Sequence, residues 1–277
     1  IMLTTRVIPA VILLSALLGV LFGGYNPLFA AAIVLFLVAA VWEAFQLFGS
    51  SKKQAFAIAL FWGAAFAYTF LFQDNQSTQF WFALCAAIWL VRFVPALGHG
   101  LPPPQGIGNT LLGTVYGLSL VGCFAAMVVF YQHSPVYLLS VMALVWVADI
   151  GAYFSGKAFG KRKLAPSISP GKSWEGAIGG GIAVLLFSAA LILSGDPMVA
   201  DTFAVKLQSS RGWLAAMAIL AVIVAASVVG DLFESMLKRR AGVKDSSKLL
   251  PGHGGVLDRI DALVPVLPFA ALIDAWL

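Results

Sequence analysis

The sequence SMLKRRAGVKDSSKLLPGHGGVLDRID, residues 235–261, carries three consecutive basic side chains, a Lys-Asp pair, a glycine-rich turn around His253 and two aspartates three positions apart. The residues around it are mostly apolar: 61% of the chain is hydrophobic and 10% is charged, against about half and about a quarter in water-soluble domains. The mean hydropathy is +0.94. Because helices satisfy their own backbone hydrogen bonds in lipid, the chain is predicted to be an all-α, polytopic integral membrane protein.

Outward from this stretch, about nine segments reach the roughly 20 mostly apolar residues that cross a bilayer. They are residues 6–22, 27–48, 55–72, 79–97, 107–131, 136–159, 173–193, 212–237 and 256–277. The polar linkers between them are short, so residues 1–277 are predicted to form a single membrane domain. Residues 1–135 are expected to supply lipid-facing scaffold helices, and residues 136–277 to carry the active helices and loops.

Basic residues gather in the connections that follow the second, sixth and eighth predicted segments. They are Lys52, Lys53, Lys157, Lys161, Arg162, Lys163, Lys172, Lys238, Arg239, Arg240, Lys244 and Lys248. By the positive-inside rule, these connections and the amino terminus face the cytoplasm and the carboxyl terminus lies outside. This orientation explains the net charge of +5 without nucleic-acid binding, and it predicts a multi-pass protein of the inner (cytoplasmic) membrane.

Carboxylates near the ends of apolar segments indicate a function, since an aspartate at the centre of a membrane helix costs about 2.5 to 3.5 kcal/mol on insertion scales. Asp149 and Asp231 each follow long uncharged runs. Asp258 and Asp261, at positions i and i+3, share a helix face, where like charges repel unless a cation lies between them. Oxygen ligands favour Mg²⁺, which is often shared with substrate phosphates.

Other polar residues near these aspartates have less specific interpretations. Glu43 and Glu234 are interpreted as interfacial carboxylates in water or as partners of loop lysines. Asp149 is either a neighbour of a metal site or the partner of a basic loop residue, and Tyr153, one turn later, is expected to shape the pocket.

Two glycine-containing turns lead into predicted helices and resemble anion sites, because free backbone N–H groups at a helix start attract phosphates. One is PGHGG, residues 251–255; the other is SPGKS, residues 169–173, with Ser173 as the expected helix N-cap. The second is not a phosphate-binding P-loop, because Pro166 occupies the place of its first glycine. Gly176 and residues 179–181 are instead expected to allow close helix packing. The residues alone thus predict a cytoplasmic site for a polyphosphate and Mg²⁺ beside lipid.

At this point the sequence resembles the signature of the phosphatidate cytidylyltransferases, or CDP-diacylglycerol synthases. The resemblance rests on residues 235–261 and on VWVADIGAYFSGKAFGK (145–161), SPGKSWEG (169–176) and VVGDLFESMLKR (228–239). It is strong over residues 141–262 and limited to the hydrophobic pattern and Trp42-Glu43 in the first 130 residues. It is closest to the bacterial members of the family.

The resemblance implies a homodimeric, all-helical membrane enzyme that uses CTP and phosphatidic acid to form CDP-diacylglycerol and pyrophosphate for phospholipid synthesis. It implies Mg²⁺ with K⁺ as a second cation, held by Asp231, Asp258 and Asp261. The expected catalytic residues are Asp231, Asp258, Asp261, Lys244, Asp245 and His253. The expected substrate-binding residues are Ser169, Gly171, Lys172, Ser173, Lys238, Arg239, Gly252, Gly254, Gly255, Arg259, Asp149 and Tyr153.

Alternatives stay open at this stage. His253 is either a proton-transfer group or a donor to phosphate and organiser of its loop. The alternative lipid acceptor to phosphatidic acid is a polyprenyl or ether-lipid phosphate. An ion-coupled transporter is disfavoured because the acids gather toward one membrane face, and a structural scaffold would need neither glycine-led turns nor clustered aspartates.

Overall fold

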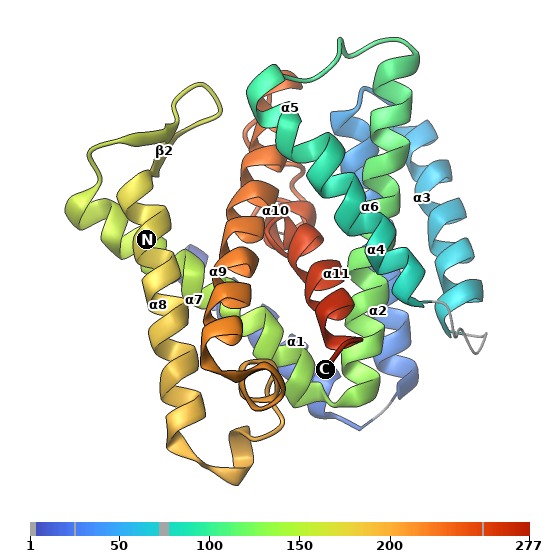
Figure 1. Cartoon of the computed structure of the whole chain (residues 1–277). Coiled ribbons are helices and arrows are strands. Elements are labelled where there is room, and N and C mark those ends of the chain that lie inside the picture. Colours follow the sequence, from blue (N-terminus) through green and yellow to red (C-terminus); the bar gives the residue numbers. More distant parts are fainter. Residues whose placement is uncertain (1–3, 25, 72–77, 251) are drawn as a thin grey trace.

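The computed structural model describes residues 4–24, 26–71, 78–250 and 252–277 and is almost entirely helical (Figure 1). Its α-helices are α1 (Thr4–Phe22), α2 (Asn26–Leu47), α3 (Lys52–Phe66), α4 (Thr78–Ile88), α5 (Val94–His99), α6 (Ile107–His133), α7 (Pro135–Phe159), α8 (Trp174–Ser194), α9 (Phe203–Arg240), α10 (Leu257–Ile260) and α11 (Leu263–Asp274). Two π-helical stretches, η1 (Ala67–Leu71) and η2 (Trp89–Phe93), extend α3 and α4, and a 3₁₀ turn, η3 (Pro197–Val199), precedes α9. Strands β1 (Lys163–Ala165) and β2 (Ser169–Ser173) form an antiparallel hairpin.

Within the described residues, six helices are long and apolar enough to cross a membrane. They are α2, the continuous helix from Thr78 to His99, α6, α7, α8 and α9. The all-α membrane class is therefore confirmed, whereas the count of nine spanning helices is not. Residue 72, the end of the predicted third segment, lies outside the described residues.

The last predicted segment, residues 256–277, is not one spanning helix. A turn at Asp261 and Ala262 divides it into α10, of 4 residues, and α11, of 12 residues. At 1.5 Å per residue, α11 rises about 18 Å, which is less than the roughly 30 Å of a bilayer core. It is a short buried helix that contacts α4, α6 and α9.

The core is built around α6, whose side chains are buried along most of its length. Near its first half, Tyr116, Phe93 and Phe233 form an aromatic cluster with ring centroids 4.5 to 5.7 Å apart. Peripheral helices expose apolar side chains instead, including Phe61 at 71% and Leu186 at 67%. Such surfaces suit contact with lipid chains rather than water.

Figure 1 shows α8 and the hairpin on one side of the molecule, α2, α3, α4 and α6 on the other, and α9 with α11 between them, while α7 crosses from the end of α6 to α8. Glycines allow α7 and α8 to approach closely. A Cβ at Gly180 would lie 2.5 Å from the carbonyl oxygen of Ala148, and one at Gly151 would lie 2.6 Å from the Cβ of Ala183. The predicted packing role is confirmed for Gly176, Gly179 and Gly180, whereas Gly181 has only a Val224 methyl group at 3.9 Å. The close approach of α7 and α8 positions the hairpin that joins them.

Candidate active site

A polar cavity of about 440 Å³ lies between α7, β2, α8 and α9. Lys172, on β2, forms an ion pair with Asp231, on α9, at the wall of this cavity. Ser173 caps α8 as predicted, because its hydroxyl accepts a hydrogen bond from the N–H of Gly176 at 3.1 Å. The hairpin and cap thus present Lys172 toward the α9 aspartate. The turn predicted around residues 169–173 is a strand, not an open loop.

Several predicted residues line this polar cavity, namely Asp149, Tyr153, Gly171, Lys172, Ser173 and Asp231. Tyr153 is 63% exposed. Ser169 does not line the cavity and instead pairs with Ala165 at the start of β2. Asp149 lines the same cavity as Lys172 and Asp231, so it lies near a basic residue and near a predicted metal ligand, and both alternatives stand.

The end of α9 places Lys238 against two carboxylates. Its ammonium group forms ion pairs with Glu234, one turn earlier, and with Asp258, at 2.6 Å from Oδ1. Glu234 is fully buried, so the interpretation as a lysine partner is confirmed, although the lysine is on the same helix rather than in a loop. Arg239 donates to the carbonyl of Ile168 at 3.4 Å and connects α9 to the hairpin.

Asp258 is held by the chain itself through its second carboxylate oxygen. This oxygen accepts from the N–H of Ser246 at 2.9 Å, its hydroxyl at 2.9 Å and the N–H of Gly255 at 2.7 Å. Burial acts to raise the pKa of Asp258, but the hydrogen bonds from Lys238 and Gly255 outweigh it and hold the pKa below its usual range. Asp258 is therefore an ionised structural anchor of the loop after α9.

Asp261 lies in the turn between α10 and α11 and faces Asp231. Burial raises the pKa of Asp261, and the negative charge of Asp231 raises it further. Asp261 therefore has like-charge neighbours in both Asp231 and Glu234, whereas Asp258 points toward Lys238. Within the part of the chain that the structure describes, no group of three His, Cys, Asp or Glu side chains is arranged to hold a metal ion. Two neighbouring carboxylates that repel each other nevertheless suit a cation between them.

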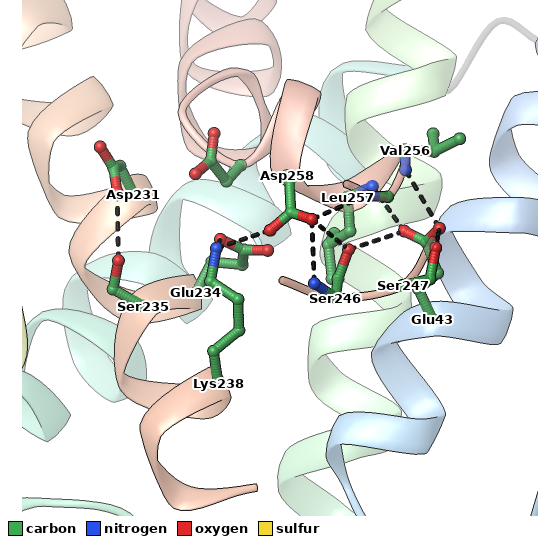
Figure 2. A network of polar contacts seen from close by, with 12 residues as sticks. Glu43, Asp231, Glu234, Ser235, Lys238, Ser246, Ser247, Val256, Leu257 and Asp258 are labelled. Carbon is green, nitrogen blue, oxygen red and sulfur yellow. Dashed lines mark hydrogen bonds and ion pairs between the residues drawn. The ribbon is translucent and has the colours of Figure 1, made fainter. Parts of the chain in front are cut away.

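The start of α10 corrects the expectation for Glu43 and for the PGHGG turn. Glu43, on α2, is fully buried rather than in interfacial water, and its carboxylate accepts the N–H groups of Val256 and Leu257 at 3.0 and 2.7 Å (Figure 2). The N–H of Gly255 is bonded to Asp258. The helix start does hold anions, as predicted, but they are two carboxylates of the chain.

A second polar cavity, of about 630 Å³, contains most of the remaining predicted residues. It is lined by Lys244, Asp245, Ser247, Lys248, Leu250, Gly252, His253, Gly254 and Arg259. Its turn is closed by a hydrogen bond from the N–H of His253 to the carbonyl of Leu250, at 2.9 Å. Gly252 and Gly254 have φ angles of 76° and 78°, which only glycine adopts readily. The lysines and arginine make this cavity suitable for phosphate.

An apolar cavity of about 430 Å³ extends from these polar groups between α1, α2, α6 and α7. Its wall includes Leu17, Phe36 and Trp146, and its polar end contains Asp149, Arg259 and Asp261. Asp149 also lines the hairpin cavity and Arg259 also lines the loop cavity. The apolar cavity therefore meets both polar cavities at charged residues.

Sequence reasoning missed the contributions of Glu43, Ser246 and Ser247. The available signal was Glu43 itself, the only charge in the 22 residues of α2. Nothing in the local pattern identified its partners, which lie more than 200 positions away.

A helical membrane protein in which two cavities lined by lysine side chains share lining residues with an apolar cavity fits the class that handles both phosphates and lipids. The comparisons with known proteins agree with this class. The chain belongs to the cytidylyltransferase family, whose model matches residues 4–276.

Curated relatives match nearly the whole chain. The phosphatidate cytidylyltransferase of Haemophilus influenzae is 39% identical over 97% of this chain and 97% of its own length. That of Pseudomonas aeruginosa is 41% identical over 99% of this chain and 98% of its own length. The Thermotoga maritima enzyme of the same name is 44% identical over 49% of this chain and 47% of its own length.

Proposed function

We propose that this protein transfers the cytidylyl group of CTP to phosphatidic acid, giving CDP-diacylglycerol and pyrophosphate. The observation that carries the proposal is the junction of the cavities. An apolar cavity suited to acyl chains shares Asp149 with a cavity that holds two lysines and two aspartates, and it shares Arg259 with a basic cavity suited to phosphates. A water-soluble nucleotide and a lipid phosphate could meet there. The family and the printed names of its full-length relatives support the same reaction.

The chemistry needs positioning and charge neutralisation rather than a covalent intermediate. An oxygen of the phosphatidate phosphate attacks the α-phosphorus of CTP, the new P–O bond forms, and the bond to the β-phosphate oxygen breaks to release pyrophosphate. The attacking oxygen is already an anion at neutral pH, so no base must remove a proton. Lys172, Lys244 and Arg259 would screen the phosphates that must approach each other. His253 is therefore better interpreted as a hydrogen-bond donor to phosphate than as a proton-transfer group.

We propose Mg²⁺ as the cofactor, with K⁺ as a second cation. Asp231 and Asp261 fit such a group because they are partly buried and their charges repel. When bound, the cation would neutralise charge on the triphosphate. Asp258 remains a predicted metal ligand. To bind a cation, it would have to give up hydrogen bonds to Lys238 or to the loop.

The membrane arrangement in this proposal is a homodimer in the inner membrane with the hairpin and the loop after α9 facing the cytoplasm. The basic residues of these two connections support the orientation, and the signature residues support the dimer through the family resemblance.

The deciding experiment is pyrophosphate release by the purified protein in detergent with Mg²⁺, phosphatidic acid and CTP, ATP, GTP or UTP in turn. We expect turnover with CTP alone, dependent on both lipid and Mg²⁺. A polyprenyl phosphate in place of phosphatidic acid is the acceptor control. Turnover with that acceptor and none with phosphatidic acid, from folded protein, would contradict the proposed substrate.

A further inference from the structure

The carboxylate of Glu43 is the centre of a network that joins α2 to both ends of the loop after α9 (Figure 2). It accepts a hydrogen bond from the hydroxyl of Ser247 at 2.6 Å, and it shares the single hydroxyl proton of Ser246, at 3.0 Å, with Asp258. It also accepts the two backbone N–H groups at the start of α10 that were described above. All four donors are neutral and Glu43 is completely buried, so the carboxylate oxygens are satisfied by hydrogen bonds from the chain itself.

These four donors bracket the loop that carries the phosphate-binding candidates. Ser246 and Ser247 precede Lys248 and His253, and Val256 and Leu257 follow them. One side chain therefore fixes the two ends of the loop relative to each other and to α2. We call the described residues 246–250 and 252–257 the clamped loop.

The contacts of Glu43 explain why residue 255, at the end of the turn, is a glycine. A Cβ at Gly255 would lie 2.5 Å from Oε2 of Glu43, closer than any real Cβ contact. The absence of a side chain at Gly255 therefore lets the carboxylate reach the helix start. This explains the glycine by contact with Glu43 rather than by contact with a phosphate.

Ser246 links the clamp to the charged groups of α9. Its hydroxyl lies 3.0 Å from Oε2 of Glu43 and 2.9 Å from Oδ2 of Asp258, and Asp258 is paired with Lys238. Displacement of the loop at Glu43 would therefore displace Asp258, and with it the start of the turn that carries Asp261.

We propose that Glu43 is a positioning residue: it sets the geometry of the clamped loop, and through it the binding of a phosphate substrate, without contacting the reacting atoms. This inference rests on the proposed function for its kinetic consequence, but its structural consequence does not. The N-terminal half of the chain would thus supply a part of the site rather than scaffold alone.

The test replaces Glu43 by Gln. The glutamine side chain keeps one oxygen that can accept hydrogen bonds, but its NH₂ group replaces the other oxygen and faces two donors of the loop. About half of the hydrogen bonds to residue 43 are therefore lost. Two readouts are measured: amide hydrogen exchange across the protein in detergent, and KM and kcat for CTP and phosphatidic acid. Ser247→Ala, which removes one donor and leaves three, is the milder variant should Glu43→Gln fold poorly.

The matched control is Asp201→Asn, which weakens another carboxylate network. Asp201 accepts from Ser134 at 2.6 Å and pairs with Lys206 and with His133 if that ring is protonated, both at 2.8 Å. The Asp201 network lies at the C-terminal end of α6. The part of α2 that carries Glu43 lies near the opposite end of α6, where Asn109 donates a hydrogen bond to the carbonyl of Phe48. The control therefore loses stability far from the clamped loop.

We expect Glu43→Gln to accelerate exchange selectively in the clamped loop and to raise the KM of one phosphate substrate about tenfold, the effect of losing roughly 1.4 kcal/mol. Ser247→Ala should shift both readouts less and in the same direction, and Asp201→Asn should shift neither. Uniformly faster exchange, or fewer active molecules with an unchanged KM, would overturn the inference. If the unmodified protein does not turn over CTP, the proposed function fails, and the exchange pattern still decides whether Glu43 positions the loop.

Discussion

Lys172 and Asp231 show how a single contact can prepare a site for phosphate. In the structure the lysine is neutralised by the aspartate, so a phosphate or a cation that binds there must exchange one partner for another. Such an exchange keeps both charges compensated before and after binding, which avoids leaving a partly buried charge unpaired.

Replacing Lys172 by Met should lower kcat/KM for CTP by about 10- to 100-fold, because a charge-assisted hydrogen bond of roughly 1.5 to 3 kcal/mol is lost. The measurement is pyrophosphate release. Lys163→Met is the matched control: Lys163 lies opposite Ser173 in the same hairpin but does not line the cavity. Equal losses in the two variants would mean that the hairpin's general charge, not Lys172, matters.

Asp258 should make stability depend on pH in a defined direction. Its pKa is lower in the folded protein than in the unfolded chain, so its ionised form stabilises the fold above about pH 4, and this contribution disappears as the pH falls through the folded value. Thermal unfolding in detergent should therefore show Asp258→Asn less stable than the unmodified protein at pH 7. The difference should shrink below about pH 4; a gap that stays constant down to pH 3 would contradict this assignment.

At the scale of elements, the packing of α7 against α8 sets the position of the hairpin. Neighbouring glycines in α8 have opposite surroundings: the added Cβ at Gly180 meets a backbone oxygen of α7, whereas that at Gly181 meets only a Val224 methyl group at 3.9 Å.

Gly180→Ala should destabilise the protein by about 1 to 3 kcal/mol, since α7 and α8 must separate to admit the methyl group. Gly181→Ala should be neutral or stabilising by up to about 1 kcal/mol, because alanine favours the helix. Unfolding in detergent measures both. A similar loss in both variants would show that helix propensity or lipid contact, rather than the α7–α8 approach, determines the effect.

The elements also show which features the sequence could predict. Local patterns sufficed for the long apolar helices, for the Ser173 cap and for the packing glycines, because each depends on residues close in the chain. They failed for residues 256–277, where apolar composition concealed a turn and a helix too short to span. They also failed for the partners of Glu43 and Asp261, since periodicity carries no information on contacts between distant segments.

At the scale of the whole molecule, the two ends of α8 provide a test of orientation that does not depend on the number of spans. The hairpin precedes α8 and η3 follows it, and 21 residues rise about 31 Å. The hairpin and the segment before α9 should therefore lie on opposite sides of the bilayer.

Single cysteines at Arg162 and Asp196 should react differently with a membrane-impermeant thiol reagent on intact cells. We expect labelling at residue 196 and none at residue 162 until the membrane is permeabilised. The native Cys85 and Cys123 are buried, so the unmodified protein should give little background. Labelling of residue 162 alone would reverse the proposed orientation.

The clamp at Glu43 also imposes an order on biogenesis. Leu257 follows Glu43 by 214 positions, so at about 5 to 20 residues per second its N–H is synthesised roughly 10 to 40 s later. During that interval the nascent α2 carries a carboxylate without its native partners, while the intervening helices enter the membrane. The two halves of the site can join only after the last segments have left the ribosome. Assembly of the site is therefore a late step in the synthesis of the protein.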